Sequence, residues 1–306
     1  MKTAGVILGA GLGSRLRPFT DALAKPLVPV LDRPVIAYTM ATMAAAGVEE
    51  IFVNLHHRAD QMRAALMRGD SAVPVTTRLE PTLSGPAGAL RVFADDLAPY
   101  DAVVVASGDV LIEADLTGLL NRHRTGGASL TVAVTRQQRG RNFGVLDIAD
   151  DGRITRAREK PPVPDEEWHW VSAGIYCLSP SLIRDFPATG TYDYAADLVP
   201  DLLARGERVT TWPLPGAWED IGTPAALRRA NLRAAQGRIH VGEGCEIGVG
   251  VELHAPLVIG AGARIGAHSW LQDCVVLPGS VVPAHTVLVG ALVAPRVTDS
   301  TPETAG

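Results

Sequence analysis

Hydrophobic and polar positions follow two different periods along the chain. Up to about residue 235, short runs rich in β-branched residues alternate with helical stretches. The pattern predicts strands at Val6–Leu8, Ile51–Asn54, Val73–Thr77, Ala102–Ser107 and Ser129–Thr135. It predicts helices at Val35–Ala46, Arg58–Arg68 and Leu116–Arg124. Because apolar strands alternating with helices are typical of parallel sheets, we expect a Rossmann-like, mostly parallel sheet with helices on both faces.

From residue 236 onward the hydrophobic pattern changes to a six-residue period. Aliphatic residues stand at Val241, Ile247, Leu253, Ile259, Ile265, Leu271, Leu277 and Val289, and glycine follows several of them directly. A period of this kind is typical of a hexapeptide β-helix, whose aliphatic side chains stack inward on successive coils. We therefore expect a short left-handed parallel β-helix at 236–297, a first domain at 1–235 and a disordered polar tail at 298–306.

Composition and charge narrow the classes of function. The 306 residues are 47% hydrophobic with a formal net charge of -5, which argues against a general nucleic-acid-binding surface. No apolar run reaches the roughly 18 residues of a membrane helix, and no secretory signal begins the sequence. The three cysteines lack any CxxC spacing, so we expect reduced thiols, no zinc site and a cytoplasmic protein.

A glycine-rich turn follows the first predicted strand, and cations lie just beyond it. Consecutive amides in such a turn form an anion-binding nest, and Arg15 and Lys25 add positive charge, so the stretch suits a polyphosphate. A dinucleotide fingerprint would need glycine in place of Ser14, and a Walker loop would need lysine after Gly13. A purely structural turn leaves the cations unexplained. The turn residues that we expect to bind nucleotide are Leu8, Gly9, Ala10, Gly11 and Gly13.

These residues resemble the signature of the sugar-1-phosphate nucleotidyltransferases, the nucleotide-sugar pyrophosphorylases. The resemblance is carried by GAGLGSRLRP followed by KPLVPV. It extends through ASGDV (Ala106–Val110), NFGVL (Asn142–Leu146), EKP (Glu159–Pro161), SAGIYCLSP (Ser172–Pro180) and WEDIGTP (Trp218–Pro224). The stretch AHSWLQDCVV (Ala267–Val276) resembles the hexapeptide domain of mannose-1-phosphate guanylyltransferases, so the likeness spans almost the whole chain.

The resemblance implies a reaction between a nucleoside triphosphate and a sugar-1-phosphate. The sugar phosphate attacks the α-phosphorus, and the products are an NDP-sugar and pyrophosphate. Two anions must meet, so positioning and charge neutralisation are the protein's main tasks. The resemblance places Arg15 on the leaving pyrophosphate and Lys25 near the reacting phosphates. The sugar-phosphate-binding residues that it implies are Gly144, Glu159, Lys160 and Ser172. On spacing alone, Glu159 and Lys160 would be a solvated surface pair.

Two aspartates are the candidate metal ligands. Asp109 follows the predicted strand Ala102–Ser107, and ligands bind at the carboxyl ends of parallel strands. Asp220 lies in WEDIGTP, far along the chain. Either could instead cap a helix or a turn, but both match the family's metal positions. Carboxylate oxygens suit Mg²⁺, so we expect magnesium as the cofactor.

The stretch LEPTLSGPAGAL (Leu79–Leu90) is the expected base-binding loop. Its nucleotide-binding candidates are Glu80, Gly85 and Gly88. Glu80 stands five residues before Gly85, where the family carries a polar residue at the base edge. A carboxylate only accepts hydrogen bonds, and guanine offers two adjacent donors, so Glu80 favours GTP. Pro86 stands where the guanylyltransferases usually carry Thr, and UTP, dTTP and ATP remain alternatives.

The sugar and two other classes of function remain open. Ser172 stands where many relatives carry Asn, so mannose, another hexose, a heptose or a cyclitol phosphate all fit. A non-catalytic nucleotide-sugar-binding subunit would not need the cations and aspartates named above. A hexapeptide acyltransferase would use a histidine of the C-terminal domain, but such enzymes usually need more coils. We expect the β-helix to serve assembly into a homo-oligomer, a dimer or tetramer.

Overall fold

The computed structural model describes residues 2–69 and 71–295, and the predicted tail at 298–306 lies outside them. The described chain divides into two compact units. The first comprises the residues up to Leu12, Ala24–Pro26 and Ile36–Asp220. The second comprises Gly13–Leu23, Leu27–Val35 and the described residues from Ile221 onward. No described helix is both long enough and apolar enough to cross a membrane.

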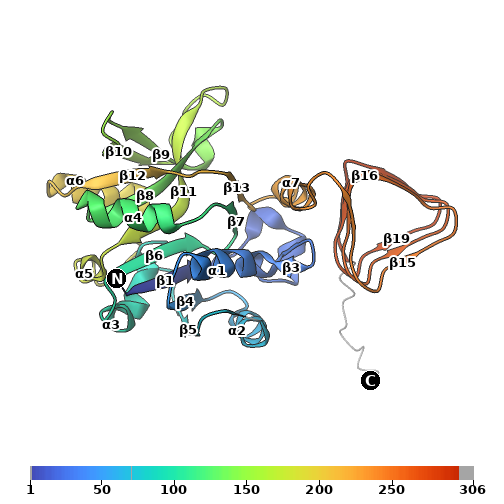
Figure 1. The fold of residues 1–306 in the computed structure, drawn as a ribbon, viewed down its shortest axis with the longest axis horizontal. Coiled ribbons are helices and arrows are strands. Elements are labelled where there is room, and N and C mark those ends of the chain that lie inside the picture. Colours follow the sequence, from blue (N-terminus) through green and yellow to red (C-terminus); the bar gives the residue numbers. More distant parts are fainter. Residues whose placement is uncertain (1, 70, 296–306) are drawn as a thin grey trace, which may run out of the picture. The chain divides into compact units, whose positions relative to one another are not determined.

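The first unit is built on a nine-stranded mixed sheet (Figure 1). Its strands are β1 (Thr3–Leu8), β4 (Glu50–Leu55), β5 (Val75–Leu79), β6 (Ala102–Ser107), β8 (Leu130–Gln137), β9 (Gly144–Ile148), β10 (Ile154–Glu159), β11 (His169–Leu178) and β12 (Val209–Pro213). A separate antiparallel ribbon pairs β7 (Val110–Glu113) with β13 (Ala217–Asp220). The helices of this unit are α1 (Val35–Ala45), α2 (Ala59–Arg68), α3 (Ala94–Leu97), α4 (Thr117–Gly126), α5 (Pro180–Ile183) and α6 (Val199–Ala204).

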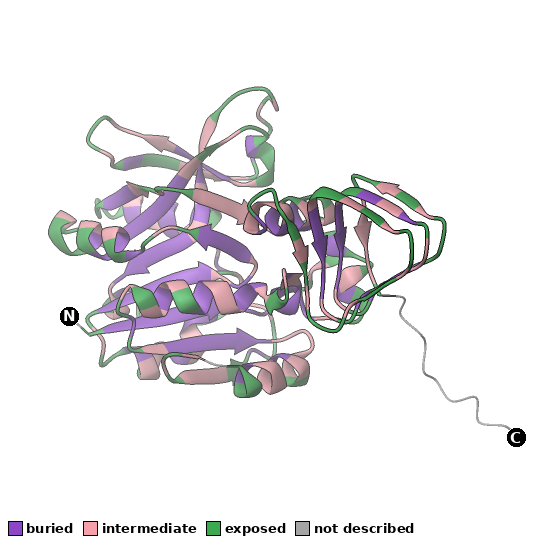
Figure 2. Cartoon of the chain, turned by 45° about the vertical axis from the view of Figure 1, so that its right-hand side comes forward, coloured by how far each residue is buried: buried purple, intermediate pink, exposed green. Residues whose placement is uncertain are grey.

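The predicted alternation of strands and helices is confirmed, with small shifts at the ends. Strand β5 starts two residues later than expected because Pro74 has no N–H to donate to the ladder. Helix α1 ends one residue early, and Gly47 follows with a left-handed φ of 85°. Strands β1, β4 and β6 are almost wholly buried, as expected for strands covered on both faces (Figure 2).

The sheet is less parallel than predicted. Strands β6, β1, β4 and β5 run parallel in that order, and they form the expected core. Strand β11, however, pairs antiparallel with β6 and with β8, and β10 pairs antiparallel with β9. A short connection joins β9 to β10, and such connections favour antiparallel neighbours. Strand β12 pairs parallel with β8, so the part of the sheet that follows β6 is mixed. The prediction of parallel strands therefore holds for the core but not for the whole sheet.

The C-terminal part of the second unit consists of short parallel strands stacked on one another (Figure 1). They are β14 (Ile239–Val241), β15 (Glu246–Ile247), β16 (Glu252–Ile259), β17 (Arg264–Ile265), β18 (Trp270–Val276), β19 (Val281–Val282), β20 (Val287–Val289) and β21 (Leu292–Val293). Ile239 lies beside Leu257 and Glu252 beside Trp270, an offset of eighteen residues, or three six-residue periods. The offset falls to seventeen from Trp270 to Val287.

The inward stacking of the aliphatic residues holds in the middle of this stack. Ile259, Ile265 and Leu271 are buried in one apolar cluster. Val241 and Val289, which we also expected to point inward, are 44% and 63% exposed. They lie on the first and last layers, where a neighbouring layer covers only one side.

A short hairpin near the N-terminus belongs to the second unit. It pairs β2 (Pro29–Val30) with β3 (Arg33–Pro34). Asn231, on helix α7 (Pro224–Ala234), is fully buried and accepts from the Leu31 amide at 2.7 Å. Asp32 accepts from the Ala261 amide at 2.7 Å and binds His240 at 2.9 Å. These contacts group the hairpin and α7 with the stacked strands, so the compact units do not follow the expected boundary at residue 235.

Candidate active site

The glycine-rich turn begins at the carboxyl end of β1, in the parallel part of the sheet. Gly9 donates its amide to the Asn54 side-chain oxygen at 2.8 Å, and a Cβ on Gly9 would lie 3.0 Å from the Asn54 carbonyl oxygen. Gly9 therefore allows close packing against Asn54. We expected its amide to bind a nucleotide, but that amide is already bonded to the Asn54 side chain. A Cβ on Gly11 would meet no described heavy atom within 4 Å. Gly13 and Arg15 belong to the second unit.

A cavity of about 280 Å³, the glycine-turn pocket, lies next to this turn. It brings together six predicted site residues from three segments, namely Leu8, Ala10, Gly11, Glu80, Gly85 and Asp109. Its other lining residues are Asn54, Leu83, Pro86, Ala89 and Ser107. The sequence reasoning missed Asn54 and Ser107, although each is a polar residue at the end of an apolar strand. The parallel register places Ser107 beside Leu8 and Leu8 beside Asn54, so the three strand ends meet at this pocket.

Glu80 lies at this pocket as part of a buried polar cluster. It is 2% exposed, and its carboxylate accepts from the Asn54 side-chain amide and from the Ser84 amide, both at 2.7 Å. The Ser84 hydroxyl donates to it as well. Asn54 thus joins the Gly9 amide to the Glu80 carboxylate, and Glu80 in turn holds the start of the following loop. Three of the carboxylate's acceptor positions are already used within the protein.

Gly85 and Gly88, predicted to bind nucleotide, have structural reasons to be glycine. Gly85 has a φ of 81°, and a Cβ there would lie 2.6 Å from the Tyr192 carbonyl oxygen. A Cβ on Gly88 would lie 2.5 Å from a guanidinium nitrogen of Arg91. Gly85 still lines the glycine-turn pocket, whereas Gly88 lines an adjoining cavity, described below, that shares Glu80 and Leu83 with it.

Lys25, Asp109 and Asp220 form a mostly buried charge cluster in the first unit. The Lys25 ammonium binds the Asp109 carboxylate and lies 3.9 Å from an oxygen of Asp220. The ribbon β7–β13 explains the convergence, because Asp220 pairs with Val110, the residue after Asp109. The predicted clustering of these two distant aspartates is therefore present. Among residues 2–69 and 71–295, no three His, Cys, Asp or Glu side chains form a metal-binding group by themselves.

A second cavity of about 150 Å³, the Glu159 pocket, adjoins the first. Three of the four predicted sugar-phosphate residues line it: Gly144, Glu159 and Ser172. Leu8, Pro86 and Ser107 line both pockets, so the two cavities meet around the ends of β1 and β6. Lys160 does not line the Glu159 pocket, but its ammonium binds the Glu159 carboxylate.

Tyr176 and Asp193 line the Glu159 pocket and were not predicted. The Ser172 hydroxyl forms a hydrogen bond with the Tyr176 hydroxyl at 2.9 Å. Burial raises the pKa of Tyr176 well above its ordinary value, so the phenol remains protonated at neutral pH. Asp193 accepts from the amides of Ala195 and Ala196 and thereby caps the helical turn Tyr194–Leu198. Tyr176 lies within the quoted SAGIYCLSP stretch, which was the available signal.

Comparison with known proteins gives one family and several relatives. The sequence model of the family described as "Nucleotidyl transferase" matches residues 4–237. A mannose-1-phosphate guanylyltransferase of Mycobacterium tuberculosis is 28% identical, over 92% of this chain and 82% of the relative. A UTP–glucose-1-phosphate uridylyltransferase of Synechocystis is 29% identical, over 94% of this chain and 80% of the relative.

Solved structures share the fold of the described sheet. A Bacillus anthracis crystal structure, assigned as a glucose-1-phosphate thymidylyltransferase, superimposes with a TM-score of 0.67 at 26% identity. The match covers 76% of this chain and 95% of the other. The names of these relatives specify different nucleotides, but all of them name the transfer of a nucleotidyl group to a sugar-1-phosphate.

Proposed function

Since the chain belongs to the nucleotidyl transferase family and is a sugar-1-phosphate nucleotidyltransferase, we propose that it transfers guanylyl from GTP to a sugar-1-phosphate. The products are a GDP-sugar and pyrophosphate. One observation carries this proposal: the glycine-turn pocket and the Glu159 pocket share Leu8, Pro86 and Ser107, with Asp109 at the first pocket. Two substrates bound in adjoining pockets are in position to react with each other.

The nucleotide is proposed to occupy the glycine-turn pocket. Gly11 supports this placement because, beyond its chain neighbours, no described heavy atom lies within 4 Å of the position of its missing Cβ. The Ala10 and Gly11 backbone would follow the phosphates, with Arg15 on the leaving pyrophosphate. Gly13 completes the proposed turn, and its left-handed φ of 67° favours glycine.

The sugar phosphate is proposed to occupy the Glu159 pocket. Its phosphate oxygen attacks the α-phosphorus, a new P–O bond forms, and the bond to the β-phosphate oxygen breaks as pyrophosphate leaves. Glu159 accepts hydrogen bonds from sugar hydroxyls, with Gly144 and Ser172 beside it. Lys160, now paired with Glu159, holds the incoming phosphate, and Lys25 neutralises charge at the reacting phosphates. The reaction needs no covalent intermediate on the protein.

Asp109 and Asp220 fit a divalent cation. Two carboxylates already converge on one positive group, the Lys25 ammonium, and each is about one-quarter exposed. Mg²⁺ is usually held by one or two carboxylates together with substrate phosphates, so this donor set suits it. When bound, the ion would supply positive charge to the phosphate oxygens. Lys25 shares these carboxylates and would orient them towards the nucleotide.

Guanine is proposed as the base because the base side of the pocket carries a carboxylate, Glu80, and because guanylyltransferases are among the relatives. Direct recognition of guanine would require Glu80 to exchange its contacts with Ser84 for contacts with the base. The uridylyl- and thymidylyl-specific names among the relatives make UTP and dTTP the alternatives. Mannose-1-phosphate is the first acceptor to test, followed by other hexose, heptose and cyclitol phosphates.

The stacked C-terminal strands are proposed to form a left-handed hexapeptide β-helix that serves assembly, with a domain boundary near residue 235. The family match ending at residue 237 supports this boundary. Exposed valines on the outer layers, including Val249 at 76%, support a homo-oligomer, a dimer or tetramer. The three cysteines are free, which fits the reducing cytoplasm.

A matrix of pyrophosphate release tests the proposal. GTP, UTP, dTTP, ATP and CTP are each combined with mannose-, glucose- and galactose-1-phosphate in the presence of magnesium. The proposal predicts release that depends on both substrates and is fastest with GTP. Binding of nucleotide sugar without release in any combination would instead support a non-catalytic regulatory subunit. Acyl-CoA hydrolysis would point to the acyltransferase alternative.

A further inference from the structure

Two loops of the first unit are joined by a compact set of backbone hydrogen bonds. The Tyr192 amide donates to the Ser84 carbonyl at 2.8 Å. The amides of Ala87 and Gly88 both donate to the Tyr192 carbonyl at 3.0 Å. Gly85 permits this approach, because any Cβ there would collide with the Tyr192 backbone. The junction therefore ties residues 84–88 of the base-binding loop (Leu79–Leu90) to the segment at 187–193.

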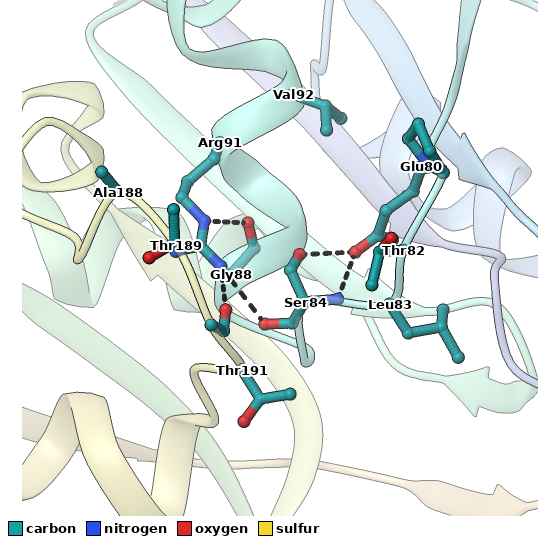
Figure 3. A pocket seen from close by; sticks show the side chains of 12 residues that line it. Glu80, Thr82, Leu83, Ser84, Gly88, Arg91, Val92, Ala188, Thr189 and Thr191 are labelled. Atoms are coloured by element: carbon teal, nitrogen blue, oxygen red, sulfur yellow. Dashed lines mark hydrogen bonds between the residues drawn. The ribbon is translucent and has the colours of Figure 1, made fainter.

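Arg91 adds a second set of bonds to the same junction (Figure 3). Its guanidinium donates to the carbonyls of Gly88 at 3.0 Å and Ser84 at 3.5 Å on its own side. It also donates to the carbonyls of Gly190, at 2.5 Å, and Pro187 on the other side. A guanidinium has five donors in one plane, so it can bind several carbonyls that lie on different sides of it. Across the described part of the chain, Arg91 forms no ion pair with a carboxylate, so these carbonyls are its partners.

The segment opposite Arg91 has little else to order it. Residues 187–191 are exposed and lie in no helix or strand. Arg91 supplies the side-chain hydrogen bonds to this segment among the described residues. A cavity of about 510 Å³ lies between the two loops, lined by Thr82, Leu83 and Val92 on one side and Thr189 and Thr191 on the other (Figure 3).

The two joined loops meet at the substrate pockets, because Pro86 of the base-binding loop lines both the glycine-turn pocket and the Glu159 pocket. The base-binding loop contributes Glu80 and Gly85 to the glycine-turn pocket. The segment after Tyr192 contributes Asp193 and Ala195 to the Glu159 pocket. A movement of one loop on binding its substrate would therefore be transmitted to the other through the junction.

We propose that Arg91 is a positioning residue that couples the base-binding loop to the Glu159 pocket. This inference rests on the proposed function, because it assumes nucleotide in one pocket and sugar phosphate in the other. Arg91 contacts neither pocket and acts through the backbone of residues 187–190. Nucleotide binding orders the junction, and the ordered junction holds Asp193 at the second pocket. The nucleotide thereby prepares the site of the sugar phosphate.

Hydrogen exchange of the full-length protein tests the coupling. GTP with magnesium and without any sugar phosphate is the probe, so turnover is prevented. In the unaltered protein, GTP should slow exchange at 187–193 as well as at 80–88, by about fivefold or more. In Arg91→Ala the slowing at 187–193 should largely disappear at saturating GTP, while 80–88 remains protected. Arg91→Lys, with fewer and differently directed donors, should be intermediate.

Steady-state kinetics separate this role from a general loss of stability. Arg91→Ala should raise the KM for the sugar phosphate by about two- to thirtyfold while leaving the order of preference among nucleotides unchanged. Arg124→Ala is the matched control, because this exposed arginine binds only Asn121 within α4 among the described contacts. It should change neither measurement.

Two results would overturn the inference. One is GTP protection confined to residues 80–88 in the unaltered protein, which needs no variant. The other is equal protection of 187–193 in Arg91→Ala. Failure of the unaltered protein to bind any nucleotide would instead contradict the proposed function.

Discussion

The two glycine-containing loops of the first unit use glycine for different reasons. In the loop at 85–88, Gly85 is required by the protein's own backbone, since Tyr192 occupies the space that a Cβ would fill, whereas a Cβ on Gly88 would meet the end of the Arg91 side chain. In the turn after β1, Gly9 is packed against Asn54, whereas Gly11 lines the pocket and an added Cβ there would meet no described atom within 4 Å. A glycine motif therefore does not by itself mark a ligand. A glycine whose added Cβ would collide with protein atoms is explained by packing, whereas one with open space at that position is a candidate for ligand binding.

The largest expected effect on activity comes from a substitution outside both loops, at Asp109. Asp109→Ala should lower the rate of pyrophosphate release by about 100- to 1,000-fold, because the proposed cation would lose one of its two carboxylates and would no longer be held at the reacting phosphates. Stability should change little, since Asp109 is partly exposed and Lys25 keeps Asp220 as a partner. Initial rates at saturating magnesium measure the first effect, and urea unfolding measures the second. An unchanged rate would remove Asp109 from the proposed metal site.

Gly85→Ala should be the most destabilising change in either loop. A left-handed residue other than glycine costs roughly 1–2 kcal/mol. The collision with Tyr192 adds to this cost, so the free energy of unfolding should fall by about 3 kcal/mol or more. Gly47→Ala is the matched control, with a φ of 85° and no described atom within 4 Å of the added Cβ. If urea unfolding gave equal losses for the two variants, the packing explanation for Gly85 would be wrong.

Glu80→Gln changes a residue that, together with Asn54, connects the turn after β1 to the base-binding loop. One side of a carboxamide is a donor, so it must face either the Asn54 amide or the Ser84 amide, and one hydrogen bond is lost. The free energy of unfolding should fall by about 1–3 kcal/mol. The ratio of kcat/KM for GTP to that for UTP should also fall, by about tenfold, if Glu80 binds guanine. A general loss with an unchanged ratio would leave Glu80 with a positioning role only.

Gly11→Ala should have the smallest effect on stability and a clear effect on binding. The added methyl group meets no described protein atom, so unfolding should shift by less than about 0.5 kcal/mol. The KM for the nucleotide should rise about tenfold, equivalent to about 1.4 kcal/mol, because the methyl enters the proposed phosphate path. A variant with an unchanged KM would show that the open space at Gly11 is not used by the nucleotide.

Sequence reasoning found the elements and many site residues because local patterns specify them. Strand β6 was predicted with its observed bounds, since its apolar run ends sharply at a polar residue. Asp109 and Asp220 were predicted as joint metal ligands from family motifs and, for Asp109, from its place at the carboxyl end of a predicted strand. The ribbon β7–β13 is the physical reason that they converge.

The features that sequence reasoning missed depend on contacts between distant segments. The bond from the Gly9 amide to Asn54 joins residues 45 positions apart, and the Arg91 bond to Gly190 joins residues 99 positions apart. No local pattern encodes such pairs. The hairpin containing Asp32 groups with residues beyond 221 for the same reason, which is why the predicted boundary did not describe the compact units.

The fate of the phosphates of GTP tests the central claim most directly. GTP labelled with ³²P at either the α- or the γ-phosphate is incubated with the protein, magnesium and the best acceptor from the substrate matrix. Nucleotidyl transfer predicts α-label in the sugar nucleotide and γ-label in pyrophosphate. Recovery of γ-label in the sugar product would contradict the account, and so would the absence of labelled sugar product from both labelled forms of GTP.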